Sequence, residues 1–67
     1  MEIRYSQHAL DRMSERGMSE EAIEKALKPP NKIKDGHGSS KIAVKGNIRV
    51  VYTHKGNYIL IVSVTTI

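Results

Sequence analysis

The spacing of hydrophobic residues changes once along the 67-residue chain. Before Pro29-Pro30, apolar residues recur at intervals of three and four, which is typical of helices packed through one face. After this pair they alternate with polar residues, which is typical of strands. The pattern predicts an α+β fold in which helices precede a sheet.

Two helices joined by a tight turn are expected in the first half. Gln7–Arg16 follows Ser6, a good N-cap, and Gly17 ends the helix in the C′ position. Ser19 caps a second helix that carries Ile23, Ala26 and Leu27 on one face and stops at Pro29-Pro30. A short strand, Glu2–Tyr5, is expected before the first helix.

The second half predicts an antiparallel meander separated by turns that contain Gly. Its strands are expected at Lys32–Asp35, Lys41–Lys45, Ile48–His54 and Tyr58–Thr66. The last strand is apolar on both faces, which indicates a central, covered position. The predicted fold is therefore a single domain, residues 1–67. It has a short N-terminal strand and a two-helix hairpin packed on one face of a three- to four-stranded antiparallel sheet.

Alternation along these strands predicts which side chains face the helices. Ile42 and Val44 share one face of their strand, and Ile48, Val50 and Tyr52 share one face of the next. If these apolar faces meet the helices, the opposite face of the sheet carries three cations, which are Lys41, Lys45 and Arg49. These three are the expected RNA-binding residues, although a solvated sheet face explains them equally well.

The charge distribution is uneven. The chain carries a formal net charge of +4, which divides into −2 over residues 1–27 and +6 over residues 28–67. A basic half of this size favours a polyanion as partner, most plausibly nucleic acid, although small proteins also carry lysines for solubility.

Length and composition exclude several classes of protein. Sixty-seven residues leave no room for a two-domain enzyme or a large enclosed cofactor pocket, and no cofactor is expected. The absence of Cys excludes disulfides, thiolate metal sites and a Cys nucleophile. No metal site is expected, because the three histidines, His8, His37 and His54, lack ligand spacing. The longest apolar run is too short to span a membrane and no leader is evident, so a cytoplasmic location is expected.

The first predicted helix carries the most distinctive group of polar residues. His8, Arg12 and Arg16 follow one another at intervals of four, so they form one stripe along the border of the apolar face. Two arginines on such a stripe suit a phosphate, and a histidine beside them suits proton transfer. The competing interpretation is structural: Arg12 pairs with Asp11 or Glu15, and Arg16 caps the helix end.

These residues also carry a resemblance to a known family. The segment has the order Ser, any residue, His-Ala, two residues, Arg-Met, two residues, Arg-Gly, an apolar residue and Ser. In this chain these are Ser6, His8-Ala9, Arg12-Met13, Arg16-Gly17 and Met18-Ser19. The motif resembles that of proteins grouped as domain of unknown function 4258, and the resemblance extends over essentially the whole chain. More distantly, the chain is similar to the RelE/ParE/BrnT toxins, which implies a RelE-like fold.

The resemblance implies metal-independent cleavage of RNA by attack of the 2′-OH, in a system with an antitoxin-like partner protein. In such a reaction His8 acts as acid or base, and Arg12 and Arg16 stabilise the phosphorane. His54 is the expected second proton carrier, with Tyr52 as a weaker choice. Arg49, Tyr52 and Thr65 match the family less securely.

A non-catalytic module is the alternative hypothesis. The basic face or a free sheet edge would then bind RNA or an acidic partner protein without turnover. DNA recognition by the second helix is not expected, because Glu20 and Glu21 in its first turn would face phosphates.

Overall fold

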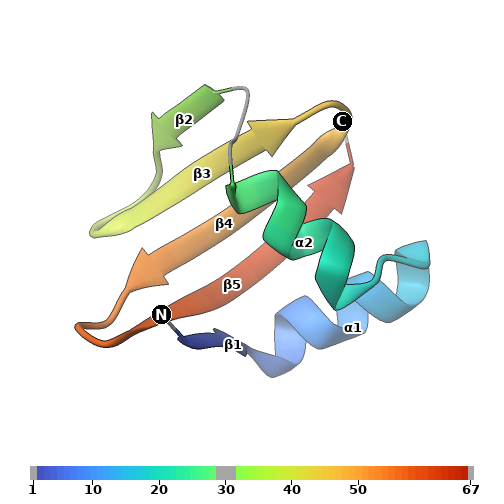
Figure 1. The fold of residues 1–67 in the computed structure, drawn as a ribbon, viewed down its shortest axis with the longest axis horizontal. Helices are drawn as coiled ribbons and strands as arrows, with labels where there is room; N and C mark the ends of the chain where they lie inside the picture. Colours follow the sequence, from blue (N-terminus) through green and yellow to red (C-terminus); the bar gives the residue numbers. More distant parts are fainter. Residues whose placement is uncertain (1, 29–31, 67) are drawn as a thin grey trace.

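A computed structural model describes residues 2–28 and 32–66, which form two helices and five strands. In chain order these are β1 (Glu2–Tyr5), α1 (Gln7–Arg16), α2 (Glu20–Leu27), β2 (Lys32–Asp35), β3 (Ser40–Lys45), β4 (Ile48–His54) and β5 (Tyr58–Thr66). Helix α1 packs on β5, and α2 crosses β3 and β4 (Figure 1). The helices and the sheet form two layers, as predicted for an α+β fold.

Both helices begin and end where the sequence predicts. The hydroxyl oxygen of Ser6 accepts a hydrogen bond from the backbone N–H of Ala9 at 3.1 Å, and Ser19 caps α2 in the same way. Gly17 adopts a left-handed conformation with φ of 65°, which ends α1. Pro29 and Pro30, the predicted stop signal of α2, lie outside the described residues.

The sheet is mixed, so the prediction of a purely antiparallel sheet of three or four strands is wrong. The strand order is β1-β5-β4-β3-β2, in which β1 pairs with β5 in parallel and the other neighbours are antiparallel. Side-chain alternation indicates which face of the sheet a residue occupies. It gives no information on whether the neighbouring strand runs parallel or antiparallel. Strand β5 lies between β1 and β4, so its predicted interior position is confirmed. The prediction that both its faces are covered is wrong, because Val62 is exposed and Leu60 is partly exposed.

An irregularity in β5 changes the side-chain alternation of this strand. Val51 pairs with Ser63 while Tyr52 pairs with Ile61, so Val62 is an extra residue in the described β4–β5 pairing. Burial follows this shift. Ile61 and Val64 are both fully buried on the helix side, although three positions separate them.

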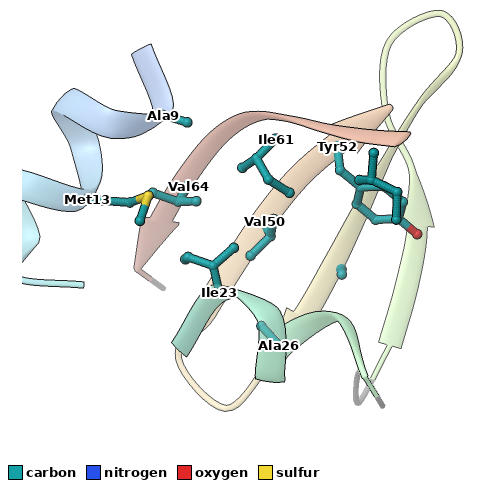
Figure 2. Packing of buried hydrophobic residues seen from close by; sticks show 10 residues of the cluster. Ala9, Met13, Ile23, Ala26, Val50, Tyr52, Ile61 and Val64 are labelled. Carbon is teal, nitrogen blue, oxygen red and sulfur yellow. The ribbon is translucent and has the colours of Figure 1, made fainter. Parts of the chain in front are cut away.

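The hydrophobic core lies between the helices and one face of the sheet. Its largest fully buried side chains are Ile23, Val50, Ile61 and Val64 (Figure 2). The smaller buried residues Ala26 of α2 and Ala43 of β3 belong to the same cluster. Small side chains on both elements allow the backbone of a helix to pack closely on a strand.

Tyr5, at the end of β1, has a buried hydroxyl group. The Tyr5 hydroxyl has no hydrogen-bond partner among the described residues. Burial raises the pKa of Tyr5 to about 12, and the nearby carboxylates of Glu24 and Glu20 add to this rise. Replacing Tyr5 with phenylalanine is expected to increase the free energy of unfolding by about 1 kcal/mol, because the desolvated hydroxyl is removed.

The same substitution is expected to change the pH dependence of stability. A pKa that folding raises makes the folded state lose stability as the pH rises from about 10 towards 12, and the phenylalanine variant lacks this loss. Urea denaturation at neutral and alkaline pH measures both effects. Tyr58→Phe is the matched control, because the Tyr58 hydroxyl is not among the buried side-chain groups that lack a partner in the described residues. Equal effects of the two substitutions would contradict the assignment to Tyr5.

Candidate nucleic-acid interface

Helix α1 presents the predicted polar stripe at the border of its buried face. Ala9 and Met13 are buried against the sheet, Arg12 is half-buried, and His8 and Arg16 are exposed. Because α1 is regular from Gln7 to Arg16, residues four positions apart lie one above the other. The stripe of His8, Arg12 and Arg16 therefore exists as one surface, which we call the α1 stripe.

Arg16 connects the end of α1 to the end of β5. Its Nη1 donates a hydrogen bond to the Thr66 hydroxyl oxygen at 2.9 Å. Thr66 is a site neighbour that the sequence did not indicate, because the two residues are 50 positions apart. The hydroxyl is neutral, so the contact orients the guanidinium and leaves its positive charge uncompensated.

The structural alternative for Arg12 is not observed. Within residues 2–28 and 32–66, the ion pairs join Glu2 to Arg4, Glu21 to Lys25 and Asp35 to Lys41. Asp11 instead accepts a hydrogen bond from Gln7 at 3.0 Å. Arg12 and Arg16 thus place two like charges one turn apart without a carboxylate partner in the described parts of the chain. Such a pair is mutually repulsive until an anion binds between its members.

His54 lies away from the α1 stripe. It pairs with Ile59 near the start of β5, and its ring meets that of Tyr52 edge-on at 6.0 Å. Helix α1 begins beside Val62, to which the Ser6 hydroxyl donates a hydrogen bond, and ends beside Thr66. Ile59 and Thr66 are separated by about 20 Å of extended strand. The fold therefore gathers His8, Arg12 and Arg16 on one helix. The pairing position of His54 on β5 is about 20 Å along the strand from the Arg16 end of the α1 stripe and about 10 Å from its His8 end.

The predicted alignment of Lys41, Lys45 and Arg49 on one sheet face is wrong. Ala43 is fully buried on the helix side and pairs with Val50, so Lys41 and Lys45 also point to the helix side. Arg49 pairs with Val44 on the opposite face. The more apolar pair of β3, Ile42 and Val44, lies on the face away from the helices, because the small Ala43 packs beneath α2.

The turn between β3 and β4 indicates which face of the sheet Lys45 occupies. Gly46 has φ of 59°, and the two-residue connection places Lys45 directly opposite Ile48. Cross-strand partners point to the same face. Since Ile48 was predicted to face the helices, Lys45 had to face them as well.

Lys41 is engaged by a neighbouring carboxylate. Its Nζ lies 2.5 Å from Asp35 Oδ1, and both side chains are exposed. The hydrogen bond and the charge of Lys41 lower the pKa of Asp35, and Asp35 raises the pKa of Lys41 in turn. Lys41 is therefore less available to an external anion than Arg12.

The described surface offers no enclosed site. Residues 2–28 and 32–66 form no detectable pocket and no group of three or more potential metal-ligating His, Asp or Glu side chains. Neither α1 nor α2, the helices in the described part of the chain, is long and apolar enough to cross a membrane.

The fold and the α1 stripe define a small α+β protein with a basic helix border. Residues 5–66 match the family described as Domain of unknown function (DUF4258), and the chain belongs to this family. The matched region includes the whole α1 stripe. No curated protein and no solved structure matches the chain.

Proposed function

We propose that this protein binds RNA through the α1 stripe. The observation that carries the proposal is that Arg12 and Arg16 lie one turn apart with no carboxylate partner in the described residues. Planar guanidinium groups bind phosphate oxygens in a bidentate manner, and their Cβ atoms at this spacing are about 6 Å apart. Two neighbouring phosphates, or one phosphate between the two groups, fit this arrangement.

RNA cleavage is the second candidate, and His8 on the same stripe favours it. His8 would move the proton of the attacking 2′-OH, and the two arginines would stabilise the phosphorane. His54 is not part of this stripe, so the stripe itself supplies one proton carrier, His8, and two arginines. Binding without turnover therefore has the stronger support. The cleavage hypothesis also includes a distant relation to RelE/ParE/BrnT toxins, an antitoxin-like partner protein and a cytoplasmic location.

One assay tests both candidates. Purified protein is mixed with a fluorescent single-stranded RNA in EDTA, and anisotropy and product formation are followed in the same samples between about 50 and 200 mM salt. We expect binding that weakens steeply with salt and RNA that stays intact. Duplex DNA of the same length is the comparison ligand.

The outcomes separate the hypotheses. Salt-insensitive or absent RNA binding would contradict the proposed function. Cleavage that His8→Ala abolishes, with binding retained, would establish the second candidate in its place. Cleavage that persists in His8→Ala would exclude His8 as the essential proton carrier.

A further inference from the structure

The face of the sheet opposite the helices is not covered by any described element. Strand register assigns its residues in rows across the sheet. One row runs Lys32–Val44–Arg49–Thr65, and the next runs Lys34–Ile42–Val51–Ser63. A third row joins Ser40, Thr53, Leu60 and Arg4. We call this surface the open face.

The centre of the open face is apolar. Ile42 and Val51 are direct cross-strand partners, Val44 lies two positions from Ile42, and Leu60 lies in the adjoining row. All four side chains are half-buried by their neighbours and partly exposed to solvent. A contiguous apolar patch on a small protein marks an interaction surface.

The border of the open face is basic. Lys32 and Lys34 lie on the edge strand β2, Arg49 lies on β4, and none of the three has a carboxylate partner in the described residues. The other charged groups of the face neutralise each other. Glu2 is paired with Arg4 at 2.8 Å, and Arg4 also stacks on the Tyr58 ring at 4.1 Å. The free charge on this face is therefore positive.

We propose that the open face docks an amphipathic segment of a second protein, apolar along one side and acidic along its borders. The apolar side would cover Ile42, Val44, Val51 and Leu60, and the acidic borders would meet the three free cations. This charge argues against a second copy of the chain, since face-to-face pairing would place two surfaces of net positive charge against each other. The proposal concerns a different face from the α1 stripe and does not depend on RNA binding.

A randomised peptide library displayed on phage is the probe. Selection on the intact protein, followed by synthesis of the enriched peptides, gives ligands whose net charge and binding site can be measured. We expect enriched peptides to combine several apolar residues with an excess of Asp and Glu. In ¹⁵N NMR titrations, we expect their strongest shifts at the amides of Ile42, Val44, Val51 and Leu60.

Paired variants localise the binding. The double substitution Ile42→Thr/Val51→Thr keeps β-branched residues in the strands and is expected to weaken the selected peptides by about tenfold or more. Leu10→Ser is the matched control, because Leu10 is 39% exposed on α1, away from the open face. Its affinity for the peptides is expected to be unchanged. Far-UV circular dichroism and thermal unfolding check that each variant is folded.

A charge test completes the design. The triple variant Lys32→Gln/Lys34→Gln/Arg49→Gln is expected to lose most of the salt dependence of peptide binding. The proposal is overturned if the enriched peptides are neutral or basic, or if their shifts map to α1 or α2. It is also overturned if the protein dimerises in sedimentation experiments and Ile42→Thr/Val51→Thr abolishes the dimer, since a second copy would then occupy the face. RNA that shifts the open-face amides, with affinity lost in the triple variant, would assign the face to nucleic acid instead.

Discussion

Replacing Ile61 with alanine is expected to lower the free energy of unfolding by about 3 kcal/mol. Ile61 is fully buried and occupies the middle of β5, where β1 and β4 flank it through Tyr5 and Tyr52. The substitution removes three carbon atoms from the point where the sheet meets the helices. A domain of this size has a total stability of roughly 3 to 10 kcal/mol, so a large part of it is lost. Urea denaturation followed by circular dichroism measures the change.

Val62→Ala is the matched control for this prediction. Val62 is the next residue of the same strand, is 36% exposed, and is the extra residue of the described β4–β5 pairing. Its substitution is expected to cost less than about 1 kcal/mol, because little buried surface is lost. If both variants lose the same stability, Ile61 is not at the centre of the core.

Replacing Arg12 and Arg16 together with glutamine is expected to weaken RNA binding by about 10- to 100-fold at moderate salt. Each guanidinium that neutralises a phosphate releases a counterion, so the slope of log K against log salt is expected to fall by about 2 in magnitude. Fluorescence anisotropy across a salt series gives both quantities. Little change in stability is expected, since the Arg16–Thr66 hydrogen bond is exposed and Arg12 has no ion pair in the described residues.

Lys25→Gln/Lys28→Gln is the control, because it removes the same formal charge from exposed positions at the end of α2. A loss of affinity confined to the arginine variant would assign binding to the α1 stripe. Equal losses in the two variants would indicate that net charge alone attracts the RNA, and the α1 stripe would then have no special role.

Features that depend on neighbouring residues could be predicted from the sequence. Ser6, Gly17 and Ser19 set the helix ends because caps act within one turn of the chain. Helical spacing predicts that Ala9, Leu10 and Met13 share the apolar face of the first helix. Ala9 and Met13 are buried and the α1 stripe borders them, but Leu10 is wrongly placed, since it is exposed. The order of helices and strands followed from the change of hydrophobic period, and the interior position of β5 followed from its apolar composition.

Contacts between residues far apart in the chain could not be predicted from the sequence. The parallel pairing of β1 with β5, the Arg16–Thr66 hydrogen bond and the distance of His54 from α1 all join or separate segments far apart in the chain. The hydrophobic pattern of a short segment gives no information on its contacts with distant segments.

Strand β3 is the clearest case in which packing between distant segments, and not local sequence pattern, set the orientation of a strand. Its alternation favours Ile42 and Val44 for the helix side, since the other side carries Ala43 between Lys41 and Lys45, and the structure has the opposite orientation. Packing against α2 selected the small residue for the helix side, because Ala26 and Ala43 are both buried where the helix crosses the strand. The larger Ile42 and Val44 were thereby left on the open face with Arg49. The sequence thus supplied the residues of both candidate surfaces, and the close packing of a helix on a strand decided which residues share a face.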